Sequence, residues 1–189
     1  MKKMILPLLL TAATLPFTAG AQTSPGDFQK GSVITAVNEK LEGSIRDQTK
    51  NKGSILFTSA TGRKKLYSPA EISGFTLNGT DYISYSSDFY KVLVPAGKAA
   101  LYQRITDNSG KMLYNGAEVV SVTTAEGKAG DYYIQVSSDN KWIWVTQKNF
   151  ETALSAAFAD CAAVVADIKS RQTGFAQVAK AVEQYNSCH

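Results

Sequence analysis

The hydrophobic period of this chain changes near Val145, and that change constrains the fold more than any single motif. From Ser32 to about Val145, apolar and polar residues alternate in short runs separated by turn residues, which is the pattern of β-strands. After Val145, apolar residues recur every three or four positions, as on one face of a helix. The sequence predicts an α+β fold: an antiparallel, β-rich body followed by a C-terminal α-helical hairpin.

Alternation is clearest in residues 41–46, where Leu41 and Ile45 share a face, and in residues 132–137. Further strands are expected at residues 33–37, 55–58, 72–77, 82–85, 90–94, 100–105, 119–123 and 142–145. Trp142 and Trp144 share one face of the last strand and Ile143 and Val145 the other, which predicts burial on both sides.

Turn chemistry supports antiparallel pairing. Asn78-Gly79 and Asn115-Gly116 are dipeptides that accept positive φ in tight hairpins. Strands joined by such turns lie side by side and run in opposite directions. A twisted sheet, a sandwich and a partly open barrel all fit this pattern.

The C-terminal region carries two apolar stripes at helical spacing, interrupted at residues 172–174. The first comprises Phe150, Leu154, Ala157, Phe158, Cys161, Val165 and Ile168, and the second Phe175, Val178, Ala179, Val182 and Tyr185. Two antiparallel helices would bring Cys161 close to Cys188.

The first 21 residues have the features of a cleavable export signal. Lys2 and Lys3 precede an apolar run from Met4 to Phe17, and Ala19-Gly20-Ala21 offers small residues for cleavage. An uncleaved anchor would need about 20 apolar residues, and no later segment suggests a span. We expect a signal peptide at 1–21, a flexible segment at 22–31, the β-rich body at 32–146 and the helical hairpin at 147–189. The mature product would be periplasmic or extracellular.

An oxidising compartment favours a disulfide between Cys161 and Cys188. A nucleophilic cysteine would need a basic partner, and the sole histidine of the sequence is the terminal His189. A closed zinc site needs four ligands. We therefore expect a structural disulfide, no metal site and no cofactor.

Charge argues against a nucleic-acid partner. Without the signal, the 168-residue chain has 18 Lys and Arg against 16 Asp and Glu, which provides no concentrated basic surface. The run Arg63-Lys64-Lys65 follows Thr61-Gly62 and is expected to form a solvated turn.

Aromatic residues gather in the β region, where they suit either strand packing or ligand contacts. The candidate binding surface is Tyr82, Tyr85, Tyr90 and Tyr133. Carboxylates that could pair for hydrolysis are scattered, at Glu71, Asp81, Asp88, Glu118 and Asp131. Ser138-Asp139-Asn140-Lys141 contains both S-x-x-K and S-D-N, but the two motifs overlap in one expected turn, whereas catalysis needs them on separate elements.

The segment from Lys65 to Phe75, with Leu101-Tyr102, Phe158-x-x-Cys161 and Tyr185 to Cys188, resembles a group of secreted Bacteroidota-type proteins of unknown function. The resemblance covers most of the mature chain and implies no activity, cofactor or catalytic residue.

These features together favour an exported, non-enzymatic module for cell-envelope binding or assembly, with an envelope protein or a saccharide as partner. The alternative is a small secreted hydrolase, or a saccharide- or peptide-binding enzyme, that uses Asp and Glu side chains.

Overall fold

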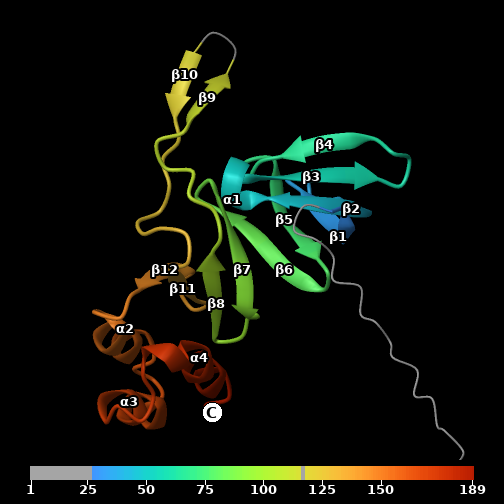
Figure 1. The fold of residues 1–189 in the computed structure, drawn as a ribbon. Coiled ribbons are helices and arrows are strands. Elements are labelled where there is room, and N and C mark those ends of the chain that lie inside the picture. The colour runs from blue at the N-terminus through green and yellow to red at the C-terminus, as the bar shows by residue number, and fades with distance from the viewer. Residues whose placement is uncertain (1–26, 116–117) are drawn as a thin grey trace, which may run out of the picture.

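The computed structural model describes residues 27–115 and 118–189, and within them ten strands form one open antiparallel sheet (Figure 1). Its strands are β1 (Gln29–Thr35), β2 (Lys40–Gln48), β3 (Ser54–Ser59), β4 (Lys64–Tyr67), β5 (Ile72–Leu77), β6 (Thr80–Tyr85), β7 (Asp88–Val94), β8 (Ala99–Arg104), β11 (Tyr132–Val136) and β12 (Lys141–Val145). Their order is β12-β11-β8-β7-β6-β5-β1-β2-β3-β4. The predicted α+β class is confirmed, and the predicted signal segment lies outside the described residues.

Smaller elements complete the β region. A short helix, α1 (Thr49–Lys52), links β2 to β3. The strands β9 (Met112–Asn115) and β10 (Glu118–Ser121) pair with each other as a hairpin that projects from the sheet on the side away from the C-terminal helices (Figure 1). The predicted Asn115-Gly116 turn falls partly outside the described residues.

Local turn chemistry explains the hairpins between consecutive strands. Asn78 and Gly79 join β5 to β6 with φ values of 49° and 76°, as predicted for a tight loop. Ser86 and Ser87 join β6 to β7 with φ values of 44° and 64°. Serine is less suited than Asn-Gly to positive φ, so this second turn had no clear sequence signal.

The cationic run did not form the expected turn. Lys64 and Lys65 begin β4, which pairs with β3 in the register Leu56 with Leu66. Lys64 and Lys65 keep their ammonium groups over aromatic rings, Lys64 near Phe28 and Lys65 near Tyr67. Cation–π contacts and an edge position let a charged segment act as a strand.

The main hydrophobic core lies where helices pack on β8, β11 and β12. Leu101 of β8 and Ile134 of β11 are neighbours in the ladder and are fully buried beneath the helices. A second core fills the region around β1, β2, β3 and β5, with Val33, Ile45, Ile55 and Phe75 at its centre. The two cores explain how a single sheet of this width is stabilised along its length.

The C-terminal helices are α2 (Phe150–Ala157), α3 (Ala162–Lys169) and α4 (Val178–Asn186), with a 3₁₀ turn at Phe175–Gln177. The hairpin is formed by α3 and α4, but the first apolar stripe is not one continuous helix as its spacing indicated. It breaks between Phe158 and Cys161, where Cys161 donates its N–H to the Phe158 carbonyl at 2.9 Å. The break keeps both residues buried, since each packs in the main core.

The disulfide Cys161–Cys188 is formed, with a Cα–Cα separation of 6.2 Å. It joins the start of α3 to the residues after α4. Asn186 fixes the same tail to the sheet: its side chain accepts the Ala99 N–H at 2.8 Å and donates to the Ala99 carbonyl at 2.9 Å. Within the described residues, no helix is long and apolar enough to cross a membrane.

Candidate functional site

The four predicted tyrosines do not form one exposed surface. Tyr82 stacks on Phe75 at 4.5 Å, on the face of β6 opposite to Ile83 and Tyr85, because strand residues alternate. Tyr85, Tyr90 and Tyr133 do come together on the other face. Tyr90 and Tyr133 are 0% and 2% exposed, so they are packing residues rather than an open platform.

Trp142 is the centre of this aromatic cluster. Its indole stacks on Tyr85 at 3.9 Å and on Tyr102 at 4.8 Å, and it meets Tyr90 edge to face at 5.4 Å. Strands lie about 4.8 Å apart, so β6 and β12 would be roughly 19 Å apart in a flat sheet. The contact between Tyr85 and Trp142 therefore requires the sheet to curve around the cluster.

A buried ion pair supports the same face. Asp88 and Arg104 are both fully buried, and Arg104 Nη2 lies 2.6 Å from Asp88 Oδ2. Burial raises the pKa of Asp88, against the hydrogen bond from Thr106 and the charge of Arg104. Arg104 also donates to the carbonyls of Ala125 and Gly127, each at 3.0 Å. The pair thus fixes the loop before β11 against the sheet.

Further contacts hold that loop over the aromatic cluster. Trp144 Nε1 donates to Asp131 Oδ2 at 3.0 Å, and the Tyr133 hydroxyl donates to the Glu126 carbonyl. At Gly127, with φ of 94°, a Cβ would lie 2.5 Å from the Tyr133 hydroxyl oxygen. Only glycine fits this approach, and it holds Glu126 beside β12.

A groove of about 580 Å³ runs along β12, between that strand and α2. One wall comes from the end of β11, the turn that follows it and β12: Val136, Ser138, Asp139, Lys141, Trp142, Ile143 and Trp144. The other wall comes from Asn149 and the small side chains Ala153, Ala156 and Ala157, with Glu126 from the loop. Its volume lies within the range of about 300–1,000 Å³ typical of ligand sites.

The strand that lines this groove is a sheet edge. The expected burial of both its faces is confirmed in part, since Ile143 packs against the main core and the two tryptophans pack against the aromatic cluster. β12 is the first strand of the sheet, and among the described residues no strand pairs with its outer side. Trp142, Ile143 and Trp144 are only half-buried. Apolar residues on both faces of a strand indicate contacts above and below it, but not whether its edge is paired.

The outward backbone groups of β12 follow from its ladder. In antiparallel pairs, alternate residues turn both N–H and C=O away from the partner strand. The Trp144 carbonyl accepts a hydrogen bond from Asn149 Nδ2 at 2.9 Å, so Trp144 turns away from β11. Two residues earlier, Trp142 turns its N–H and C=O the same way, into the groove.

Asn149 ends the free edge on one side. While its Nδ2 donates to Trp144, its Oδ1 accepts the Thr146 N–H at 2.6 Å. The side-chain amide thus provides the two hydrogen bonds that a peptide group of an adjacent strand would provide. The edge left open is centred on Trp142.

The predicted carboxylates do not converge. Glu71 bonds the Ser68 N–H and hydroxyl, Asp81 accepts from Thr76, Asp88 pairs with Arg104 and Asp131 bonds Trp144. The side chain of Glu118 is not described. Instead, two acids outside that set, Glu126 and Asp139, line the same groove.

The S-x-x-K segment forms the turn expected for it. Residues 137–140 connect β11 to β12, and Asp139 Oδ1 accepts the Lys141 N–H at 3.1 Å within that turn. Asp139 therefore shapes the loop, and its second oxygen is left for the groove. Across the described residues, no group of three or more His, Cys, Asp or Glu side chains could hold a metal ion.

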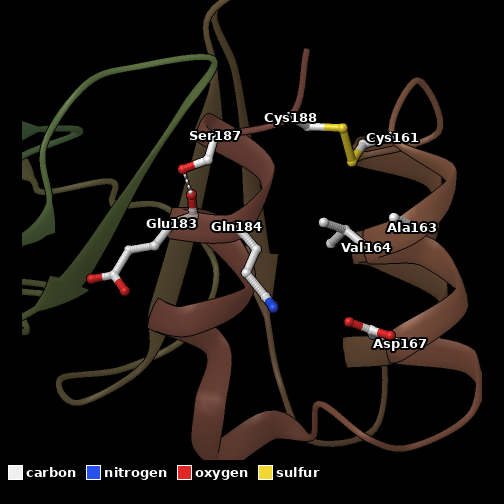
Figure 2. A pocket seen from close by; sticks show the side chains of 8 residues that line it. All are labelled: Cys161, Ala163, Val164, Asp167, Glu183, Gln184, Ser187 and Cys188. Carbon is white, nitrogen blue, oxygen red and sulfur yellow. Dashed lines mark hydrogen bonds between the residues drawn. A yellow bond between two sulfur atoms is a disulfide. The ribbon is translucent and has the colours of Figure 1, made fainter.

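A second hollow, of about 410 Å³, lies between α3 and α4. Figure 2 shows the disulfide closing one end, with Val164 and Gln184 directed into the space between the helices. Ser187 is tied to its own helix, because its hydroxyl donates to the Glu183 carbonyl at 3.0 Å. The hollow is shallow, and its polar lining consists of the Gln184 amide, the Ser187 hydroxyl and the carboxylates of Asp167 and Glu183, with no base among its lining residues.

Comparisons of the chain with protein-family models, with curated protein sequences and with solved structures each found no match. The groove beside β12 is therefore interpreted from its geometry alone. It combines a free strand edge, two tryptophans and a helix wall of small residues.

Proposed function

We propose that the protein is a non-enzymatic binding module of the cell envelope, and that its ligand is an extended peptide segment of an envelope protein. The observation that carries the proposal is the groove of about 580 Å³ along the free edge of β12. The disulfide supports an oxidising location. Export through residues 1–21, and membership of the secreted group that the sequence resembles, are parts of the same proposal.

A peptide is favoured over a compact ligand because the groove offers backbone groups. The N–H and C=O of Trp142 and the N–H of Trp144 face outward, where an added strand would pair with them. Ala153, Ala156 and Ala157 leave room between the strand and α2 for the backbone of that segment. Main-chain hydrogen bonds would give affinity, and alternate side chains would contact the tryptophans on one face and Ile143 on the other.

Charge gives the peptide a preferred composition. Glu126 and Asp139 line the groove against a single cation, Lys141. The groove therefore favours a segment with Lys or Arg beside its apolar residues.

A peptide-display selection against the mature chain tests this proposal. Selected peptides should protect the Trp142 and Trp144 amides from hydrogen exchange. N-methylation of the peptide nitrogen that pairs with Trp142 should weaken binding at least tenfold. Ala156→Trp, at an exposed position of the groove wall, should do the same, whereas Ala166→Trp, on an exposed face of α3 away from the groove, should leave affinity unchanged.

Binding that tolerates both N-methylation and Ala156→Trp would contradict strand addition. Selection that yields no peptide, with oligosaccharide fragments of the envelope binding in the groove instead, would replace the peptide by a saccharide.

A second candidate function rests on Glu126 and Asp139 lining one groove with two tryptophans. Two carboxylates facing each other across a sugar are the minimum for glycoside hydrolysis. Turnover of envelope glycans, lost in both Glu126→Gln and Asp139→Asn, would favour the hydrolase. Unchanged peptide binding with no turnover in the wild type would favour the binding module.

A further inference from the structure

A cavity of about 220 Å³ lies at the other end of the sheet from the groove, between the β3–β4 edge and the base of the β9–β10 hairpin. Its lining comes from segments far apart in sequence: residues 52–54, 66, 68–70, 87, 108, 111 and 122. Such convergence of separate segments is typical of a formed site rather than of a gap within one loop.

The walls of this cavity are divided into an apolar part and a cationic part. Leu66, Pro69, Ala70 and Val122 supply the apolar part, and Leu66 is 48% exposed although it is a large aliphatic residue. Lys52 and Lys111 supply the cationic part, and no carboxylate lines the cavity. The nearby Asp107 is engaged elsewhere, since it contacts Arg104 at 3.3 Å and accepts the Ser109 N–H at 3.2 Å.

The cationic part is held in place by buried polar residues. Asn108, 7% exposed, donates Nδ2 to the Ser87 carbonyl at 2.8 Å and accepts from Lys111 Nζ at 2.7 Å. Its own N–H donates to the buried Asp88 at 3.0 Å. The Lys111 ammonium group is therefore hydrogen-bonded at the rim of the cavity, although the residue itself is exposed.

Gly53 makes that approach possible. Its φ is 63°, and a Cβ there would lie 1.9 Å from Asn108 Oδ1 and 2.8 Å from Lys111 Nζ. Any side chain at residue 53 would displace the amide and the ammonium group. The glycine thus does more than end α1.

Ser54 provides an independent sign of a missing partner. Ser54 lines the cavity and is 4% exposed, and its hydroxyl has no hydrogen-bond partner among the described residues. A buried hydroxyl without a partner costs about 1–3 kcal/mol. A change of its side-chain rotamer toward the cavity would let this hydroxyl donate to a ligand oxygen.

We propose that this cavity binds a small organic monocarboxylate with a short aliphatic chain. The carboxylate lies between Lys52 and Lys111, within reach of the Ser54 hydroxyl, and the chain lies on Leu66, Pro69 and Val122. At about 30 Å³ for each non-hydrogen atom, the volume share of a water molecule, 220 Å³ holds on the order of seven such atoms. Pentanoate has this size and serves as the probe.

Titration of the ¹⁵N-labelled mature chain with pentanoate tests the site. We expect saturable shifts of the Gly53, Ser54 and Asn108 amide resonances, and no such shifts with pentan-1-ol at the same concentration. Lys52→Gln and Lys111→Gln should each raise the dissociation constant at least tenfold. Lys50→Gln is the matched control, because Lys50 is an exposed lysine of the same short helix outside the cavity.

Ala70→Leu should abolish binding by filling the apolar part, and Ser54→Ala should weaken it. Lys111→Gln also removes a bond to Asn108, so Lys52→Gln, which removes none, is the decisive variant. Equal responses to pentanoate, pentan-1-ol and inorganic phosphate would overturn the proposal, as would an unchanged dissociation constant in Lys52→Gln. The groove at β12 is lined by other residues, so failure of either proposal leaves the other intact.

Discussion

Asp88 of β7 and Arg104 of β8 are fully buried partners, 2.6 Å apart, and the same guanidinium holds the carbonyls of Ala125 and Gly127. One side chain thus joins the centre of the sheet to the loop that brings Glu126 to the groove. Loss of the ion pair would therefore destabilise both the centre of the sheet and this loop.

Arg104→Gln should lower the free energy of unfolding by about 3–5 kcal/mol, because it leaves the Asp88 carboxylate buried without its cation. Urea denaturation measures the loss. Asp88→Asn alone should also destabilise, and the double variant should lose less than the sum of the two single losses. Additive losses would show that the two side chains do not act as a pair. Lys40→Gln, which removes an exposed ion pair with Glu42, is the control and should leave the midpoint unchanged.

The sequence predicts local turns, but it does not predict that Asp88 pairs with Arg104. Asn78-Gly79 was predictable because the turn depends on two adjacent residues and their φ preferences. The partners of Asp88 depend on the register between β7 and β8, which shifts between Val92 and Val94. Simple alternation would place Val94 on the face of Val92, yet the bulge pairs it with Leu101 in the main core. No residue type in that segment predicts the β-bulge.

The groove at β12 is likewise only partly predictable, because local alternation can be read from the sequence and strand pairing cannot. The shared face of Trp142 and Trp144 follows from alternation along one strand and is confirmed by their common contacts with the aromatic cluster. The free edge does not follow, because it depends on β11 pairing with β8 on one side and β12 on the other. The cavity at Lys52 and Lys111 joins segments from five parts of the chain, which no local pattern connects.

The disulfide should stabilise the C-terminal region more than it determines the fold. Cys161 and Cys188 are 27 residues apart, so the chain-entropy gain is at most about 3.6 kcal/mol. We expect the double variant Cys161→Ser, Cys188→Ser to melt several degrees lower, at roughly 2–4 °C per kcal/mol for a domain of this size. Calorimetry measures the shift, and hydrogen exchange should show the loss concentrated in α3 and α4. Identical melting of the reduced and oxidised wild type would refute the role.

Buried tyrosines predict a loss of stability at alkaline pH. Burial raises the pKa of Tyr90, Tyr102 and Tyr133 above the ordinary value of 10.0, so tyrosinate is favoured in the unfolded chain. A raised folded-state pKa contributes stability fully below the unfolded value and loses it as pH rises. The free energy of unfolding should therefore fall from about pH 10 upward, as measured by urea denaturation between pH 8 and pH 11.5.

Tyr90→Phe is the sharpest check of that prediction. The Tyr90 hydroxyl is buried and has no hydrogen-bond partner among the described residues, so its removal costs no bond at neutral pH. The variant should be at least as stable as the wild type at pH 7 and lose stability less steeply above pH 10. Absorbance at 295 nm measures tyrosine ionisation in the folded chain. Ionisation of all nine tyrosines near pH 10 with the fold intact would contradict the raised pKa values of the buried tyrosines.

Asn149 should stabilise the end of the β12 edge rather than the helix that follows it. Its side chain makes no capping bond to α2, but bonds the Trp144 carbonyl and the Thr146 N–H. Asn149→Ala should therefore cost about 1–3 kcal/mol, the sum of two ordinary hydrogen bonds, and speed hydrogen exchange at Thr146. Gln147→Ala, at an exposed position of the same connection, is the control.

Asn149→Asp separates the two bonds. The carboxylate still accepts the Thr146 N–H, but it places a second oxygen against the Trp144 carbonyl, and this repulsion raises its folded-state pKa above that of the unfolded chain. By linkage, the variant should gain stability relative to Asn149→Ala as pH falls through that pKa, because protonation restores a donor to Trp144. A parallel pH dependence for the two variants between pH 3 and pH 7 would mean that the Trp144 bond contributes nothing, and the open edge of β12 would then extend to Trp144 itself.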